Sequence, residues 1–356
     1  MIERSLKVQI ERLNKSVLVL GPRQTGKTTL LGGLKPDLTL NLSKEREFQD
    51  HLTHPGLIED LIELHRPSLV FVDEVQRLPS LLNTIQSIID EHGIRFLITG
   101  SSARKLKRGQ ANLLPGRLIN RSLFPLTAKE MGYKMPTELA LKYGFLPGIV
   151  NEADVAIKQE VLTSYVSNYI KEEIQQEALT RNLVGYSTFI NCLTDWVGIE
   201  LDYSKIATKN KLNRFAVHRF FEILEDTLLG SRVPSWSFDE TLRTVKHPKF
   251  YFFDNGVTNG IHQQFQLSGS SLGSACETVI FNQIRAQLSY SGRPFEISFF
   301  RTHSGTEIDF IIQREKEIFA VEVKSNDKLG SDDVRHLTWI KGKHKKIEPV
   351  LFHFGK

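Results

Sequence analysis

Short apolar runs alternate with amphipathic stretches over residues 1–126. Residues 17–20, 69–72 and 96–98 are continuously apolar, and each run is followed by glycine, acidic or small polar residues. Runs of this length are typical of strands buried on both faces of a parallel sheet. Residues 2–13 and 55–64 carry apolar positions at helical spacing. The pattern predicts an α/β domain in which parallel strands alternate with helices.

The middle of the chain has a helical pattern. Residues 155–179 and 189–197 repeat apolar positions at helix spacing, and residues 201–236 predict a helix at 204–208, a turn, a helix at 213–229 and a strand-like tail. This order is that of a winged helix. Asn213 is placed to cap the second of these helices, with Arg214, His218 and Arg219 facing outward. Its apolar face is expected to hold Phe215, Val217, Phe220, Phe221, Leu224 and Leu228.

The last third of the chain predicts a second sheet. An aromatic strand at 246–254 precedes a helix at 272–288, and strands follow at 295–302, 306–313 and 318–324 before a helix at 332–340. The pattern therefore predicts an α/β domain at each end of the chain.

A phosphate-binding loop follows the first strand. Residues 21–28 read GPRQTGKT, which satisfies G-x-x-x-x-G-K-[ST]. In such a Walker A loop, backbone N–H groups surround the phosphates at a helix N-terminus, Lys27 reaches the β/γ-phosphates and the Thr28 hydroxyl ligates Mg²⁺. The pattern predicts binding of ATP with Mg²⁺. The residues expected to line the nucleotide here are Gly21, Pro22, Arg23, Gln24, Thr25, Gly26, Lys27, Thr28 and Thr29.

Two acids follow the second long apolar run, in the Walker B form. Asp73 is expected to hold Mg²⁺ or its water, and Glu74 to polarise the water that attacks the γ-phosphate. The next strand ends at Thr99-Gly100-Ser101. Thr99 or Ser101 is a candidate to sense the γ-phosphate, with Ser101 counted among the nucleotide contacts. The alternative is that these small residues only form a turn and cap a helix.

Residues 101–121 hold six basic residues and no acid. They fit a solvated face, a nucleic-acid patch, or a source of an arginine finger for a neighbouring subunit of a homo-oligomer. Arg117 is the candidate finger and is counted as catalytic. The six residues are Arg104, Lys105, Lys107, Arg108, Arg117 and Arg121.

A second set of acids lies near the C-terminus. Asp309, Glu322 and Lys324 form the pattern D-x₁₂-E-x-K on two predicted neighbouring strands, with Glu322 and Lys324 on one face. Paired carboxylates of this kind bind Mg²⁺ or Mn²⁺, which lowers the pKa of a water, while the lysine steadies the attacking hydroxide. Glu277, on the preceding predicted helix, would add a third metal ligand. The alternative is an edge strand with a surface ion pair.

Composition narrows the possibilities. A chain of 356 residues is too long for one ordinary core, so two or three domains are expected. No run approaches the ~18 apolar residues of a membrane span, and the N-terminus lacks the apolar centre of a signal peptide, so we expect a cytoplasmic protein with no membrane partner. Cys192 and Cys276 have no Cys or His at metal spacing, which favours buried reduced thiols.

Charge leaves the nucleic-acid question open. A net charge of +5 permits a DNA partner without requiring one. Residues 205–219 hold five Lys or Arg and no acid. Such a segment suits a helix that reads a DNA duplex, or a module that docks a protein partner and leaves a solvated basic face.

The chain resembles the bacterial and archaeal AAA-type ATPases in which a P-loop domain precedes a C-terminal region long filed as a domain of unknown function. The segments that carry the resemblance are GPRQTGKTT, LVFVDEVQRLP, LITGSSARKL, LLPGRLINRSLFPLT, YGFLPGIV, LEDTLLGSRVPSW, KFYFFDNGVTNGI and FFRTHSGTEIDFIIQREKEIFAVEVKS. One departure is that Asn255 and Val257 stand where the family tends to read Asp-x-Gly-Leu; Asp254 and Gly256 are kept.

The resemblance implies an ASCE-type P-loop ATPase domain at 1–131, a connector and winged helix at 132–237, and a restriction-endonuclease-like PD-(D/E)xK domain at 238–356. We therefore expect an ATP-hydrolysing protein that acts on DNA, with Mg²⁺- or Mn²⁺-dependent nuclease activity in the last domain. The alternative is a nucleotide-controlled switch in which the winged helix and an inactive nuclease-like fold are docking surfaces.

Overall fold

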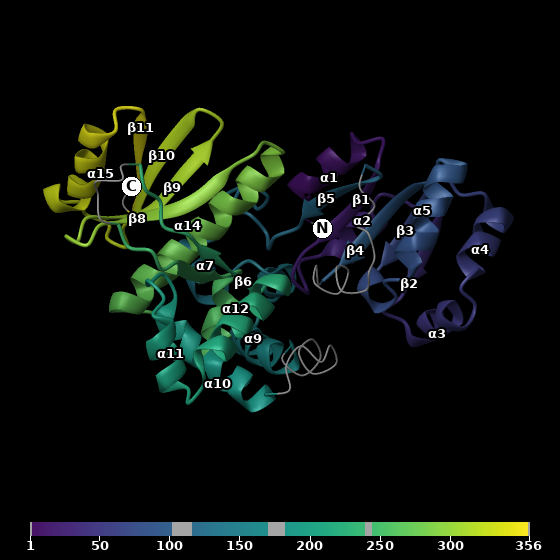
Figure 1. Ribbon diagram of the computed structural model, residues 1–356, viewed down its shortest axis with the longest axis horizontal. Helices are drawn as coiled ribbons and strands as arrows, with labels where there is room; N and C mark the ends of the chain where they lie inside the picture. The colour runs from purple at the N-terminus through teal and green to yellow at the C-terminus, as the bar shows by residue number, and fades with distance from the viewer. Residues whose placement is uncertain (1, 102–115, 170–181, 239–243, 355–356) are drawn as a thin grey trace. The chain divides into compact units, whose positions relative to one another are not determined.

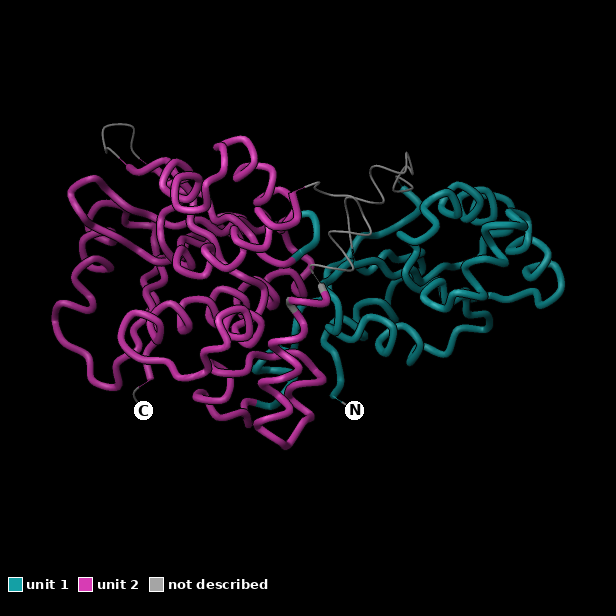
Figure 2. Tube along the Cα trace, turned by 90° about the horizontal axis from the view of Figure 1, so that it is seen from below, with its two compact units in different colours: residues 1–132, 226–228 teal, residues 133–225, 229–356 magenta. Residues whose placement is uncertain are grey.

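The computed structural model describes residues 2–101, 116–169, 182–238 and 244–354 (Figure 1). The chain divides into two compact units (Figure 2). The first unit comprises residues 1–132 and 226–228, and the second comprises residues 133–225 and 229–356.

The first unit is built on a five-stranded sheet in which all paired strands are parallel. The strand order is β2-β3-β4-β1-β5, so β4 lies between the strand before the Walker A loop and the strand before the Walker B acids. Val17, Leu18 and Val19 in β1 are all fully buried, which is why this strand reads as a continuous apolar run. The strands are β1 (Ser16–Leu20), β2 (Leu38–Asn41), β3 (Leu69–Asp73), β4 (Arg95–Gly100) and β5 (Leu118–Ser122).

Helices connect the strands of the first unit. Helices α4 and α5 bury Ile58, Ile62, Ile85 and Ile88 in the same apolar cluster as the sheet. Helix α5 ends at Gly93, whose φ of 66° suits a glycine at a helix C-terminus. The elements are α1 (Ser5–Glu11), α2 (Lys27–Gly32), α3 (Glu45–Thr53), α4 (Leu57–His65), the 3₁₀ turn η1 (Val75–Arg77) and α5 (Leu81–His92).

The second unit opens with a helical part. Helices α10, α11 and α12 are followed by an antiparallel pair of strands, β6 and β7. Residues 197–200 add isolated bridges to β7. The elements are α7 (Thr137–Tyr143), α8 (Pro147–Asn151), α9 (Val155–Tyr169), α10 (Leu183–Leu193), η3 (Thr194–Trp196), α11 (Tyr203–Lys209), α12 (Arg214–Asp226), β6 (Gly230–Val233), β7 (Lys249–Phe252) and α13 (Asn255–His262).

Helix α12 begins as expected but buries a different face. The Asn213 side chain accepts a hydrogen bond from Ala216 N at 2.7 Å, which caps the helix. Phe215, expected on the apolar face, is instead 88% exposed. At 100° per residue Phe215 lies about 160° around the helix from the buried Val217, so the expectation for this residue is wrong.

The rest of the second unit is a four-stranded sheet with two helices. Strands β8, β9 and β10 are antiparallel, and α15 provides the crossover that makes β11 parallel to β10. The elements are α14 (Gly269–Ser291), β8 (Glu296–Arg301), β9 (Glu307–Arg314), β10 (Glu317–Val323), α15 (Ser331–Lys343) and β11 (Ile347–Phe352).

One apolar core spans the second unit. It joins Phe220 of α12, Phe250 of β7, Phe281 of α14 and Phe310 of β9. The domain boundary expected between residues 237 and 238 falls inside this unit.

These elements confirm an α/β fold with a parallel sheet and a C-terminal sheet domain. Both cysteines are free and buried, and burial raises the pKa of the Cys276 thiol to about 12. Within the described parts of the chain, every helix is too short or too polar to cross a bilayer.

Candidate functional site

The Walker A loop connects β1 to α2 and is shaped by its glycines. Gly26, with φ of 92°, adopts the left-handed conformation directly before α2. A Cβ at Gly21 would lie 2.4 Å from the carbonyl oxygen of Leu123, so only glycine fits there. The Thr25 hydroxyl donates to Pro22 O at 2.9 Å across the loop. The sequence pattern therefore corresponds to a tight, self-bonded loop.

Lys27 points into the concave side of this loop. Its ammonium donates to Gly21 O at 2.9 Å and to Pro22 O at 3.0 Å, and the residue is buried. A phosphate group bound here would replace these neutral carbonyl acceptors with negatively charged oxygens, which bind an ammonium more strongly. Gln24, Thr28 and Thr29 are exposed along the same loop and helix start.

Thr28 and Asp73 come together as expected. The Thr28 hydroxyl lies 3.0 Å from Oδ1 and 2.9 Å from Oδ2 of Asp73, which is the last residue of β3. Hydroxyl and carboxylate oxygens are the donors that Mg²⁺ prefers. This pair fits a Mg²⁺ site beside the phosphates.

Glu74 is held by three neighbours from β4 and η1. Its backbone N donates to Thr99 Oγ1 at 2.9 Å, and its carboxylate accepts from Ser101 Oγ at 3.3 Å and from the amide of Gln76. Thr99 also donates to Asp73 Oδ1 at 2.5 Å. Both sensor candidates thus contact the Walker B acids.

Gln76 was not anticipated from the sequence. Its Nε2 donates to Ser101 Oγ at 2.7 Å as well as to Glu74, and its Oε1 is buried with no hydrogen-bond partner among the described residues. The available signal was its position two residues after Glu74, within the segment DEVQ.

Arg4 supports the loop from the other side and was also missed. Its guanidinium donates to Thr25 O at 2.7 Å and Phe124 O at 2.6 Å, and it lies 3.3 Å from the buried carboxylate of Glu130. Glu130 in turn accepts from the backbone N of Ser5 at 2.7 Å. No sequence pattern marks a contact between residues so far apart.

Arg117 lies away from the loop of its own chain. It precedes β5, whose first residue pairs with Ser16 at the start of β1, whereas the Walker A loop follows the end of β1. Its Nε is 2.7 Å from Asp90 Oδ1. A finger role toward a neighbouring subunit stays a prediction. The other candidates Arg104, Lys105, Lys107 and Arg108 lie outside the described residues.

The C-terminal acids meet on neighbouring strands. Asp309 of β9 and Glu322 of β10 are both buried, and Asp309 Oδ2 accepts from Val323 N at 2.8 Å. Lys324 Nζ donates to Glu322 Oε1 at 2.7 Å. The expected pairing of Glu322 with Lys324 on one face is therefore present.

A buried lysine that the sequence analysis did not identify joins this cluster. Lys249 of β7 lies 2.7 Å from Glu307 Oε1 and 3.9 Å from Glu277 Oε2, with its side chain only 2% exposed. The Tyr251 hydroxyl donates to Glu277 Oε2 at 3.0 Å. Glu277 therefore lies in the cluster as expected, with an ammonium beside it. The only signal was Lys249 within the apolar run KFYFF.

Burial and mutual proximity set the charges of the cluster. Burial raises the pKa values of Glu277, Asp309 and Glu322, and the neighbouring acids add to this effect for Glu277 and Glu322. Burial alone would lower the pKa of Lys249, but Glu277, Asp309 and Glu307 together raise it. The ion pair with Glu307 at 2.7 Å favours the charged form of Lys249.

The cluster does not form a ready metal site. Across the described ranges, no three His, Cys, Asp or Glu residues are placed to hold one metal ion. Glu277, Asp309 and Glu322 therefore belong to one cluster, but they do not surround a single point as the ligands of one metal ion would.

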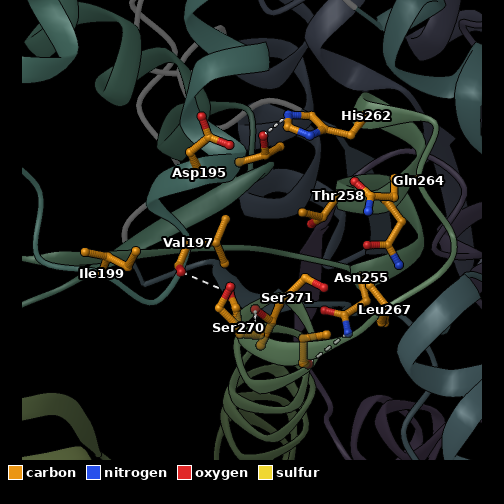
Figure 3. Close-up of a pocket in the computed structure, with 15 residues that line it drawn as sticks. Asp195, Val197, Ile199, Asn255, Thr258, His262, Gln264, Leu267, Ser270 and Ser271 are labelled. Atoms are coloured by element: carbon orange, nitrogen blue, oxygen red, sulfur yellow. Dashed lines mark hydrogen bonds between the residues drawn. The ribbon is translucent and has the colours of Figure 1, made fainter.

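A separate polar cavity of about 310 Å³ lies between η3, α13 and the start of α14 (Figure 3). Its ionisable residues are Asp195, which lies 2.6 Å from Lys209 Nζ, and His262, which bonds to Thr194 and to Asn191 O. Both ionisable side chains of the cavity therefore already have partners within the fold.

Family comparisons divide the chain into three segments. Residues 13–132 match the family described as AAA domain, residues 137–268 match a domain of unknown function (DUF8612), and residues 272–356 match another (DUF4143). The N-terminal segment is therefore similar to AAA domains, and the rest of the chain is similar to two domains of unknown function.

Three relatives that match most of the chain are named as uncharacterized proteins. An uncharacterized protein of Mycobacterium tuberculosis is 24% identical over 86% of this chain and 70% of its own length. Uncharacterized proteins of Methanocaldococcus jannaschii and Haemophilus influenzae are 25% and 23% identical, over 88% and 93% of this chain and 76% and 87% of their own.

Two solved structures show weak similarity. The replication initiator DnaA bound to AMPPCP and single-stranded DNA is 14% identical, with 62% of this chain and 86% of that chain covered and a TM-score of 0.29. The Aeropyrum pernix ORC1 protein in complex with DNA is 14% identical, with 70% and 86% covered and a TM-score of 0.25. Scores this low carry no functional argument.

Proposed function

We propose that the first unit binds and hydrolyses ATP with Mg²⁺. The observation that carries the proposal is the meeting of Thr28, at the start of α2, with both carboxylate oxygens of Asp73, at the end of β3. The match of residues 13–132 to the AAA domain supports it.

Each side chain has a defined part in this reaction. Lys27 neutralises the β/γ-phosphates, Thr28 and Asp73 hold Mg²⁺, and Glu74 polarises the attacking water. The bound Mg²⁺ supplies charge stabilisation on the phosphate oxygens. Thr99 holds Asp73 in position through a hydrogen bond of 2.5 Å, and Ser101 holds Glu74 through one of 3.3 Å.

Two variants test the ATPase proposal. Lys27→Ala removes the charge nearest the phosphates and should weaken ATP binding at least tenfold, whereas Glu74→Gln should bind ATP normally and hydrolyse it at least a hundredfold more slowly. Nucleotide affinity and phosphate release separate the two effects. Glu63→Gln, which makes the same acid-to-amide change at an exposed residue of α4, serves as a matched surface control. Unimpaired hydrolysis by Glu74→Gln would overturn the role given to Glu74.

We also propose that the second unit contacts DNA through α12. The exposed residues Arg214, Phe215 and Arg219 lie on this helix, which is in the recognition position of the winged-helix order. Cations contact phosphates, and an exposed aromatic ring contacts bases.

For the C-terminal sheet domain we favour the silent, docking role over a nuclease. The observation behind this choice is the position of the Lys249 ammonium, 3.9 Å from Glu277, which is one of the expected metal ligands, and 2.7 Å from the neighbouring Glu307. In this proposal, ATP binding and hydrolysis set the state of the first unit, and the second unit serves DNA and protein partners.

A further inference from the structure

We propose that Lys249 is the resident cation of the C-terminal carboxylate cluster and that its ammonium excludes a divalent metal ion from it. The inference deepens the silent role proposed for the C-terminal sheet domain. It does not depend on ATP hydrolysis by the first unit.

The position of the ammonium is the first argument. It lies 2.7 Å from Glu307 and 3.9 Å from Glu277, so it stands between an acid of β9 and an acid of α14. Mg²⁺ and similar ions need several oxygen ligands at about 2.1 Å in near-octahedral arrangement. A cation of that kind bound to Glu277 would be repelled by the neighbouring ammonium.

The second argument is that Lys249 is enclosed by the second unit. Its backbone pairs with Val233 of β6 and bridges to Glu200, and its ammonium also lies 5.3 Å from the centre of the Phe299 ring. Because the residue is only 1% exposed, its charge stays inside the fold beside the carboxylates.

The third argument is the state of the carboxylate oxygens. Asp309 Oδ2, Glu322 Oε1 and Glu277 Oε2 each accept a hydrogen bond, from Val323 N, Lys324 and Tyr251 respectively. Glu322 Oε2 is buried and has no hydrogen-bond partner among the described residues. Three of the six carboxylate oxygens of Asp309, Glu322 and Glu277 thus accept hydrogen bonds from protein donors. Glu322 Oε2 is among the oxygens that a metal ion could take once the ammonium is gone.

Metal uptake by variants tests this inference. We expect the full-length wild-type chain, without nucleotide, to take up no Mn²⁺ at the cluster, as followed by the loss of free Mn²⁺ signal in electron paramagnetic resonance. Lys249→Met should gain one Mn²⁺ per chain, and Lys249→Met/Asp309→Asn should lose it again. Uptake shared by all variants belongs to the Walker site and is subtracted.

A second measurement covers the case in which Lys249→Met does not fold. Lys249→Met/Glu307→Gln removes the nearest carboxylate along with the ammonium and should restore folding, because the uncompensated buried charge is reduced. Added Mn²⁺ should raise the melting temperature of either Met variant by more than that of the wild type, which binds the ion only at the Walker site.

Three results would overturn the inference. The first is Mn²⁺ uptake by the wild type that disappears in Asp309→Asn. The second is a folded Lys249→Met chain that gains no Mn²⁺. The third applies if neither Met variant folds. In that case Mn²⁺ uptake by Lys249→Arg, which keeps the positive charge, would overturn the inference if the uptake requires Asp309. A failure of the ATPase proposal would appear instead as absent phosphate release in every variant, with the Mn²⁺ results unaffected.

Discussion

Gln76 places one amide nitrogen between Glu74 and Ser101 and so fixes the direction of the acid proposed to polarise water. Glu74 itself has a φ of 59°, an uncommon backbone conformation for a residue with a side chain. The acid therefore depends on its neighbours for its position rather than on its own rotamer.

Gln76→Leu tests this positioning role. Loss of the amide should lower kcat about tenfold while leaving KM for ATP unchanged, since a misaligned base costs about 1.4 kcal/mol in the transition state without touching the phosphates. Steady-state ATPase kinetics give both parameters. Gln76→Glu is a useful second variant, because it keeps the length of the side chain but places a negative charge beside Glu74. Its kcat should fall below that of Gln76→Leu. A rise in KM with constant kcat would argue that Gln76 only shapes the binding loop.

At the scale of elements, α12 presents two kinds of side chain outward. Charge reversal at Arg214 and Arg219 should lower duplex affinity and flatten its salt dependence by about one unit of slope for each phosphate that the helix no longer neutralises. Phe215→Ala should lower affinity about tenfold with the salt slope unchanged, because a ring contact releases no counterions. Fluorescence anisotropy across a salt series measures both quantities.

The control for α12 is chosen from the same unit. Lys346→Glu reverses a charge at an exposed residue just before β11, outside residues 205–219, and should leave binding within twofold. If the α12 variants bind DNA like the wild type, the helix serves a protein partner instead.

The elements differ in how well the sequence predicts them. Strands β1, β3 and β4 could be predicted because their central residues are buried on both faces and therefore form continuous apolar runs in the sequence. Strand β11 was missed because Pro349 interrupts it, yet a proline is tolerated there since β11 is an edge strand paired only with β10. Helix α13 was missed because its sequence NGVTNGIH has poor helix propensity.

Tertiary contacts explain why α13 forms at all. The Asp254 carboxylate caps the helix by accepting from Val257 N at 3.2 Å, and it also accepts from Phe145 N at 2.7 Å. Asn259 donates to Leu141 O at 3.0 Å. The same reason applies to the functional residues: Thr28, Asp73 and Asp309 follow from local motifs, whereas Gln76, Arg4 and Lys249 act through contacts that no motif records.

At the scale of the whole molecule, folding shifts the pKa values of acids in opposite directions in the two units. Burial raises the pKa of Asp254 in the second unit to about 7, from an ordinary value of 3.8. In the first unit, hydrogen bonds from Ser68 and from Arg117 lower the pKa values of Asp37 and Asp90. Folding of the second unit therefore raises the proton occupancy of Asp254 between about pH 4 and 7, whereas folding of the first unit favours the charged forms of Asp37 and Asp90.

The second unit should consequently lose stability as pH rises through this window. An acid whose pKa is raised on folding stabilises the native state below its unfolded pKa and loses that contribution as pH approaches the folded value. Thermal unfolding followed by intrinsic fluorescence from pH 4 to pH 8 should show one transition moving to lower temperature while the other does not fall. Asp254→Asn should reduce the slope of the falling transition. Parallel pH shifts of both transitions, unchanged in Asp254→Asn, would contradict this assignment.

Lys249 also bears on the order in which the chain is made. During synthesis on the ribosome β7 emerges before α14 and well before β9, so the lysine leaves the exit tunnel ahead of Glu277 and Glu307. Until those carboxylates arrive, burying β7 would strand an ammonium in an apolar core. The helical part of the second unit must therefore wait for the C-terminal sheet, and a nascent chain stalled between these elements should remain sensitive to proteolysis there although the first unit has already closed.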